Sequence, residues 1–306
     1  MRGGCAATKR SIPEWRAHPQ GKAVASEPLL ENRIRELRPD RDWKASRRRP
    51  LEGLRVLDLT RVLAGPVATR FLAGFGAEVL RIDPPWWDEP VVVLEVALGK
   101  RCARMDLRKP SSHEGFKQML GEADVLVHGY RPDALARLGF DADQRHRICP
   151  GLVDLALDAY GWTGPWKGRR GFDSLVQMSS GIADHGMKQL GKNKPTPLPV
   201  QALDHSVGYL LATAAIRGLT NRLKMGAGCE ARTSLARMAA LLIDQPAVGI
   251  SELIAPENPG DLSEDIEETG WGPARRIKPP VVVDGAPMQW DLPASQLGSS
   301  KPRWQG

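Results

Sequence analysis

Four short apolar runs, each bounded by polar or turn-forming residues, constrain the fold of this chain more than any other feature. They are RVLDLT at 55–60, EVLRID at 78–83, DVLVHG at 124–129 and VDLAL at 153–157. Runs of this length, rich in Val, Leu and Ile, are typical of parallel strands buried on both faces. Helix-like stretches separate them, at 67–74, 112–121 and 130–139. The alternation predicts an α/β fold with an open, mostly parallel, Rossmann-like sheet and helices on both faces.

The glycines of this region do not form a nicotinamide-cofactor fingerprint. The sequence GFGA at 74–77 holds only part of the G-x-G-x-x-G pattern. It also follows the predicted helix at 67–74, whereas the fingerprint lies between a strand and the helix after it. A dinucleotide-dependent dehydrogenase is therefore not the interpretation that these residues favour.

Length and composition exclude several other classes of protein. With 306 residues the chain can form one large domain or two ordinary ones. No stretch approaches 18 uninterrupted apolar residues, so no membrane span is expected. The start, MRGGCAATKR, leads into no apolar core and is not a secretory signal. The four cysteines are scattered without metal-ligand spacing, which predicts reduced thiols, a cytoplasmic location and no metal site.

The net charge of +7 indicates an acidic ligand or surface as a partner. Nucleic acid, an acidic membrane face or a phosphate-bearing small molecule would each suit a basic protein. The basic runs at 47–49 and 169–170 are short and lack interleaved aromatic residues. No nucleic-acid-binding signature accompanies them. We therefore expect neither nucleic acid nor membrane as a partner.

One glycine-rich segment, YGWTGPWKGRRGFDSLVQMSSG at 160–181, combines features of a functional loop. It follows a predicted strand, continues through several glycines, and ends at a carboxylate, Asp173, before a helix-like stretch. An Asp in this place is commonly a helix N-cap, and it is less often a catalytic group. The two roles are compatible, because a helix N-terminus stabilises an ionised carboxylate. Gln177, one turn further on, either orients Asp173 or lies on the helix surface.

Three segments resemble the class III coenzyme A (CoA) transferase family, also called the CaiB/BaiF family. They are LEGLRVLDLTRVLAGP at 51–66, ADVLVHGYRPDALARLG at 123–139 and GFDSLVQMSSG at 171–181. The last fills the family motif G-[YF]-D-x-x-x-Q-x-x-[ST]-G, which carries the catalytic aspartate. The resemblance implies that Asp173 attacks an acyl-CoA thioester. A mixed anhydride and then an aspartyl-CoA thioester would follow, and an acceptor carboxylate would take over the CoA.

The resemblance also implies contacts with CoA, which would be a substrate and not a permanently bound cofactor. They map onto eight residues: Leu63, Ala64, Ala97, Lys100, Gly129, Tyr130, Arg131 and Arg137. Arginine and lysine suit the phosphates of CoA. Arg137 has a second interpretation, as a cation at a helix C-terminus. Pro84 and Pro85 stand where the family often has an arginine for adenine, which leaves that contact open.

Two other functions remain compatible with the sequence. A 2-methylacyl-CoA racemase would pair the aspartate with an upstream histidine, and His146 is the nearest candidate. We expect His146 to be a solvated surface residue and His205 to be structural, so racemisation is the weaker enzymatic alternative. A catalytically silent CoA-binding or partner subunit is favoured by the short C-terminal part, in which the family's small domain is missing or vestigial.

The chain is predicted to have three parts. Residues 1–50 form an extension that resembles the tail of a preceding transferase unit, with a possible strand near 23–30. Residues 51–245 form the large domain, and residues 246–306 are a proline-rich C-terminal segment. The resemblance implies an interlocked homodimer whose substrates are an acyl-CoA and a small carboxylic acid.

Overall fold

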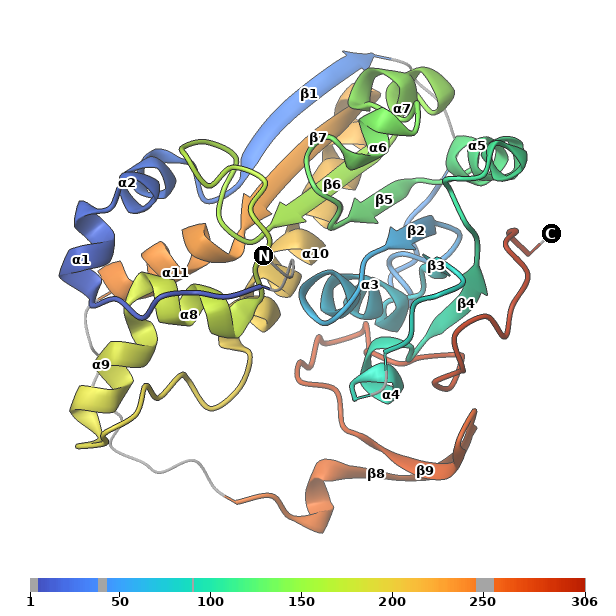
Figure 1. Cartoon of the computed structure of the whole chain (residues 1–306). Coiled ribbons are helices and arrows are strands. Elements are labelled where there is room, and N and C mark those ends of the chain that lie inside the picture. The colour runs from blue at the N-terminus through green and yellow to red at the C-terminus, as the bar shows by residue number, and fades with distance from the viewer. Residues whose placement is uncertain (1–4, 38–42, 90, 246–255, 306) are drawn as a thin grey trace.

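A seven-stranded sheet forms the centre of the molecule (Figure 1). The computed structural model describes residues 5–37, 43–89, 91–245 and 256–305. The strands are β1 (Glu31–Leu37), β2 (Arg55–Leu59), β3 (Glu78–Asp83), β4 (Lys100–Arg104), β5 (Val125–His128), β6 (Val153–Asp158) and β7 (Ala227–Ser234). Their order is β1-β7-β6-β5-β2-β3-β4, and β1 alone pairs antiparallel to its neighbour. The predicted mostly parallel α/β sheet is confirmed.

Both faces of the sheet are apolar, as the uninterrupted hydrophobic runs predict. Successive side chains of a strand point to opposite faces. Val56 of β2 and Val125 of β5 therefore join one core cluster, and their neighbours Leu57 and Leu126 join the other. All four side chains are at most 1% exposed. β2 and β5 thus contribute to two cores, which requires helices on both sides of them.

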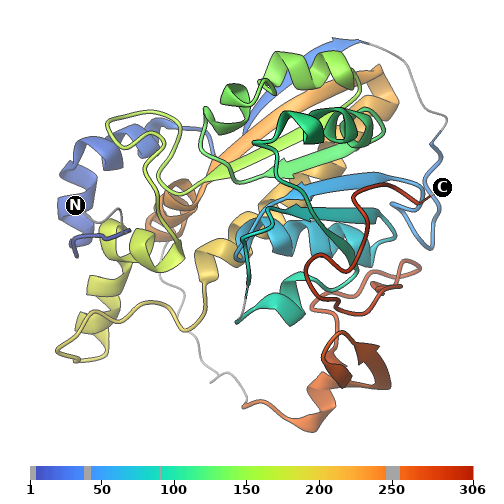
Figure 2. The ribbon, with the colours of Figure 1, turned by 45° about the vertical axis from the view of Figure 1, so that its right-hand side comes forward.

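Two helices, α3 (Ala64–Gly74) and α10 (Ala202–Met225), pack together on the first face. Gly208 permits their close approach, because a Cβ there would lie 2.7 Å from the carbonyl oxygen of Ala64. The second face is covered by α5 (His113–Gly121), α6 (Ala134–Arg137) and α7 (Ala142–Ile148). Figure 2 shows the sheet between these two layers. Two short elements, α4 (Val93–Val96) and η1 (Pro110–Ser112), flank β4 in the chain.

The N-terminal residues are part of the main fold. They form α1 (Ile12–Ala17), α2 (Pro19–Ser26) and then β1, which pairs antiparallel with β7. The strand predicted near 23–30 is therefore wrong. A capping box at Ser11 starts α1, and proline in the first turn starts α2. With α8 (Asp173–Ser180), α9 (Ile182–Gln189) and α11 (Leu235–Asp244), these helices gather beside one end of the sheet (Figure 1).

The C-terminal residues form no second α/β lobe within the described part of the chain. After η2 (Pro259–Asp261), the strands β8 (Leu262–Thr269) and β9 (Gly272–Ile277) form a separate hairpin. The remaining chain runs along the β4 edge of the sheet, where the Ser300 amide donates to the carbonyl of Cys102. Trp290 packs beside α3, and Trp304 packs into the second core cluster. In the described residues, no helix is long and apolar enough to cross a membrane.

Candidate active site

A cleft of about 680 Å³ opens at the carboxyl ends of β2, β5 and β6. Strand order reverses between β2 and β5, because β3 follows on one side and β6 on the other. Open α/β sheets bind ligands in the crevice at such a switch point. The loops after these three strands line the cleft, together with residues 168–172 of the glycine-rich segment. Topology alone therefore makes this cleft the candidate site.

Six of the nine residues predicted for catalysis or CoA contact line this cleft. They are Leu63, Ala64, Gly129, Tyr130, Arg131 and Arg137. The other three, Ala97, Lys100 and Asp173, are at most 1% exposed and do not line it. The loops that follow β2 and β5 thus bring together residues about 70 positions apart, as a parallel sheet requires.

Arginine is the dominant charged residue of the cleft. Five line it: Arg61, Arg131, Arg137, Arg169 and Arg170. Within the described residues, Arg137 alone of the five forms an ion pair, with Asp133 one turn earlier. Four guanidinium groups thus lack a carboxylate partner in the part of the chain that the structure describes. A cleft of this kind suits a ligand that carries several negative charges.

Arg61 and Trp87 are site residues that the sequence analysis missed. The guanidinium of Arg61 lies 4.9 Å from the ring centroid of Trp87 and 5.6 Å from that of Tyr130. All three side chains line the cleft. A signal for Arg61 existed, since it directly follows a predicted buried strand. Trp87 belongs to the short loop that follows Pro84–Pro85. The Arg104 guanidinium anchors this loop by donating to the carbonyl of Pro85 at 2.6 Å.

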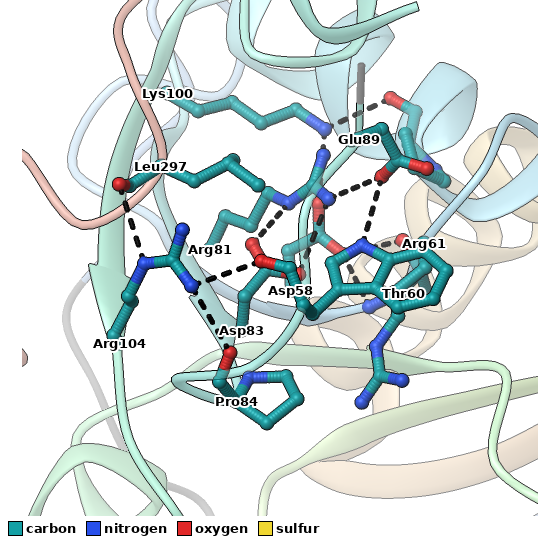
Figure 3. A network of polar contacts seen from close by, with 12 residues as sticks. Asp58, Thr60, Arg61, Arg81, Asp83, Pro84, Glu89, Lys100, Arg104 and Leu297 are labelled. Atoms are coloured by element: carbon teal, nitrogen blue, oxygen red, sulfur yellow. Dashed lines mark hydrogen bonds and ion pairs between the residues drawn. The ribbon is translucent and has the colours of Figure 1, made fainter. Parts of the chain in front are cut away.

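Lys100 occupies the protein interior and not the cleft. Its Nζ donates to Asp58 Oδ2 at 2.9 Å (Figure 3). It also donates to Thr69 Oγ1 at 2.6 Å and to the carbonyl of Pro66. Both charged side chains of the pair are fully buried. The ammonium group therefore neutralises Asp58 inside the protein. In this structure it is not available to a phosphate, contrary to the role that the resemblance implies.

The same network holds the loop that forms one wall of the cleft. Arg81 donates to Asp83 at 2.7 Å and to Glu89 at 2.5 Å (Figure 3). Glu89 in turn accepts the backbone amide of Val62 at 2.9 Å. Val62 has a φ of 66°, an unfavourable conformation for a β-branched residue that surrounding contacts must maintain. The buried ion pairs thus fix the backbone between Arg61 and Leu63.

Asp173 is the first residue of α8 and does not cap that helix, whose N-cap is Phe172. Its Oδ2 accepts the backbone amides of Leu203 at 2.8 Å and Asp204 at 3.0 Å, in the first turn of α10. The predicted N-cap of its own helix is therefore wrong. The carboxylate instead caps a helix 30 residues later, whose N-cap Gln201 forms no capping bond among the described residues.

Gln177 contacts Asp173 directly. It is 1% exposed, and its Nε2 donates to Asp173 Oδ1 at 2.5 Å. Its Oε1 accepts the amide of Leu198 at 2.8 Å, which fixes the orientation of the side-chain amide. The alternative of a surface amide is wrong. Gln177 and the α10 amides together determine where the Asp173 carboxylate points.

Two further carboxyl groups, Asp158 and Asp204, line the cleft itself. Burial raises the pKa of Asp158 to about 7, although its Oδ1 accepts the amide of Gly161 at 2.8 Å. Burial, followed by the neighbouring charge of Asp173, raises the pKa of Asp204 to about 7. Among the described residues, no group of three or more side chains could hold a metal ion.

Comparison with known proteins identifies the family of the chain. The model of "CoA-transferase family III" matches residues 51–269, more than half of the sequence. The chain belongs to this family. Succinyl-CoA:glutarate CoA-transferase of Mus musculus is 32% identical over 206 residues, which cover 62% of this chain and 46% of the relative. Succinyl-CoA–D-citramalate CoA-transferase of Chloroflexus aurantiacus is 29% identical, covering 59% and 48%.

Solved structures of family members share the fold. A CaiB/BaiF family protein from Brucella suis superposes with a TM-score of 0.57 at 25% identity, covering 73% of this chain and 65% of that one. Rv3272 from Mycobacterium tuberculosis gives a TM-score of 0.57 at 28% identity, covering 63% and 57%. The match spans between 23% and 52% of the length of the curated relatives.

The two histidines considered for this family III chain lie away from the cleft lining. His146 on α7 is 8% exposed, with its Nε2 3.7 Å from Glu230 Oε1, so the expectation of a solvated surface residue is wrong. It is buried among charged groups of β6, β7 and α7, including Asp154, Glu230 and Arg145, and burial lowers its pKa. His205 is half-buried on α10, where burial lowers its pKa. Within the described residues, no hydrogen bond or ion pair joins either histidine to Asp173.

Proposed function

We propose that this family III protein transfers CoA between an acyl-CoA thioester and a carboxylic acid through an aspartyl intermediate on Asp173. One observation carries the proposal: Asp173 lies directly behind an arginine-rich cleft at the switch point of the sheet. Its neighbours Gly171, Phe172 and Asp204 line that cleft. The names of the relatives, which describe succinyl-CoA transfer to glutarate and to D-citramalate, support the same class of reaction.

The chemistry requires a carboxylate nucleophile in a dry, polar site. An oxygen of Asp173 would attack the thioester carbonyl, forming a C–O bond and expelling the CoA thiolate with the C–S electron pair. The thiolate would then attack the Asp173 carbonyl of the mixed anhydride and release the first carboxylate. The acceptor carboxylate would reverse both steps. Two helix amides and Gln177 would hold the Asp173 oxygens in place throughout.

Access to Asp173 requires a movement at the start of α8. The carboxyl is 1% exposed, whereas Phe172 beside it is 46% exposed. Binding of acyl-CoA along the cleft would displace the turn at Gly171–Phe172 and uncover an Asp173 oxygen. Loop movements of this kind are common in enzymes that exclude water from their intermediates.

The test is Asp173→Asn, assayed by exchange of label from succinyl-CoA into glutarate and by mass spectrometry of CoA adducts on the 171–181 peptide. We expect loss of the adduct and a fall in activity of several orders of magnitude, because the covalent route disappears. Asn offers one acceptor oxygen where Asp offers two, so a stability loss of about 1 kcal/mol should accompany it. Unchanged exchange in this variant contradicts the proposal.

Asp184→Asn provides the matched control for a buried carboxylate. Asp184 is 3% exposed on α9, forms ion pairs with Lys9 and Lys188, and does not line the cleft. Its loss should lower the melting temperature while leaving exchange per folded molecule unchanged. An equal loss of exchange in both variants would assign the Asp173 effect to folding.

We further propose that the protein acts as a homodimer in the cytoplasm. Apolar side chains on α10, including Ile216, Leu223 and Met225, are between 39% and 54% exposed, which favours a partner surface. For the location, the proposal is supported by the free, buried thiols of Cys102 and Cys229, because free thiols persist in a reducing compartment. Light scattering that finds a monomer at micromolar concentration would contradict the dimer.

A further inference from the structure

Asp204 differs from the other buried carboxyl groups of the site. It is the third residue of α10, is 6% exposed, and lines the cleft. Within the described residues, no side-chain hydrogen bond or ion pair holds its carboxyl group. A buried carboxyl without a partner is costly unless it is neutral or meets a ligand. Asp204 therefore has an unused hydrogen-bonding capacity in the lining of the cleft.

Burial and the neighbouring Asp173 both favour the protonated form of Asp204. The backbone amide of Asp204 donates to Asp173 Oδ2 at 3.0 Å, so the two residues are immediate neighbours. Burial disfavours the ionised form of the Asp204 carboxyl, and the negative charge of Asp173 disfavours it further. Asp173 has three donors that stabilise its charge: Gln177, the Leu203 amide and the Asp204 amide. Asp204 has none, so it is the member of the pair that retains a proton.

We propose that Asp204 is a catalytic hydrogen-bond donor, which in its neutral form donates to the acyl oxygen of the substrate while Asp173 acts as the nucleophile. The inference rests on the proposed function. As the C–O bond forms, the π electrons of the thioester carbonyl move onto its oxygen, and the O–H of Asp204 stabilises that oxyanion. The proton remains on Asp204 when the thiolate leaves. The same O–H can donate to an oxygen of the incoming carboxylate.

Charge and geometry favour Asp204 over the other groups near Asp173. The Gln177 amide already donates to Asp173 and accepts from Leu198. Asp158 lies at the end of β6, where it accepts the Gly161 amide and where the charges of Glu27 and Arg232 act on it. An ionised Asp204 would add a second negative charge beside the nucleophile and repel an acceptor carboxylate. A neutral one attracts it.

The test compares Asp204→Asn and Asp204→Ala for exchange between succinyl-CoA and glutarate from pH 6 to 8.5. Asn keeps a donor that does not titrate, and Ala removes the donor. Both variants are made in the wild type and in an Asp158→Asn background, because Asp158 titrates in the same range in the same cleft. Asp184→Asn, away from the cleft, controls for the loss of a buried carboxyl.

We expect Asp204→Ala to lose roughly 100- to 1,000-fold in exchange at pH 6.5, as the removal of an oxyanion donor does. Asp204→Asn should stay within about tenfold of its parent there. In each background, the protein with Asp204 intact should lose about tenfold in exchange activity per pH unit above a midpoint near 7. The Asp204→Asn variant in the same background should not show this loss. An Ala variant within threefold of its parent, or an Asn variant with the parent's pH profile, overturns the inference.

A second readout separates this inference from the proposed function. Carboxyl-carbon NMR of isotope-labelled aspartate, with Asp204→Asn for assignment, should show Asp204 titrating near pH 7 without substrate. Ionisation of Asp204 throughout pH 6 to 8 overturns the inference even if exchange is robust. Failure of the wild type to exchange any acyl group, despite a titrating Asp204, overturns the proposed function and with it the substrate contact.

Discussion

Two polar regions lie next to each other along β2 and differ in whether their charged groups have partners of opposite charge. Beneath the cleft, the charges of Asp58, Lys100 and Arg81 are fully buried, and each has an opposite charge within 3 Å. In the cleft, two residues beyond the end of the strand, Arg61 has no carboxylate partner among the described residues. Buried ions must be paired because desolvation costs several kcal/mol per ion. Unpaired cations are tolerated where solvent or a ligand reaches them.

The largest effect is expected when one ion of the buried, paired region is removed. Lys100→Met keeps the length of the side chain and leaves Asp58 buried without its ammonium partner. We expect the free energy of unfolding to fall by about 3–5 kcal/mol, the usual cost of removing one member of a buried pair. Urea denaturation measures it.

Lys117→Met is the matched control for that substitution, since Lys117 pairs with Glu114 on the exposed surface of α5. It should cost at most about 0.5 kcal/mol. If Lys100→Met is equally mild, the ammonium group is not structural, and its predicted role toward CoA regains support.

The sequence allowed the sheet to be predicted because buried parallel strands leave a continuous apolar signal. The charged residues could not be placed in the same way. The resemblance assigns Lys100 a contact with CoA, but the sequence does not show that its side chain enters a polar core around Asp58. Asp173 was expected to cap its own helix because capping rules are local. The helix it caps begins 30 residues later, at an N-cap that forms no capping bond of its own in the described structure.

The second test concerns Asp158, a carboxyl in the cleft that lacks an ion-pair partner in the described residues. Its pKa is raised from 3.8 to about 7, so the folded state binds its proton more tightly than the unfolded state does. Its contribution to stability is complete below pH 4 and is lost as the pH rises to 7. Relative to Asp158→Asn, the wild type should lose roughly 2 kcal/mol of stability between pH 5 and 7.

Urea denaturation of both proteins at several pH values measures the Asp158 difference. Asn retains an oxygen for the Gly161 amide, so the comparison isolates the titration. A difference that does not change between pH 5 and 7 would show that Asp158 is ionised in the fold. The cleft would then hold a buried negative charge without a partner. This outcome would contradict the inference that buried charges in this protein are paired.

The third test removes an unpaired cation. Arg61→Ala should weaken CoA binding by about 1–2 kcal/mol, because the guanidinium has no protein carboxylate to satisfy among the described residues and is held between Trp87 and Tyr130. Calorimetry over a range of salt concentrations measures the affinity, and the salt dependence should decrease in the variant. Equal affinity would mean that Arg61 only supports the two rings.

The smallest effect is expected at Arg137, the one cleft arginine with an ion-pair partner in the described structure. Asp133 lies one turn earlier, and both side chains are 62% exposed. Its charge is already partly compensated and well hydrated, so a phosphate gains little by replacing Asp133. Arg137→Ala should change CoA affinity by at most about 0.5 kcal/mol, within the range of exposed pairs.

Asp133→Ala releases the arginine and should strengthen CoA binding slightly in the same calorimetry. If Arg137→Ala instead costs as much as Arg61→Ala, the ion pair with Asp133 opens when CoA binds, and pairing in the free protein does not identify the cations that the ligand uses.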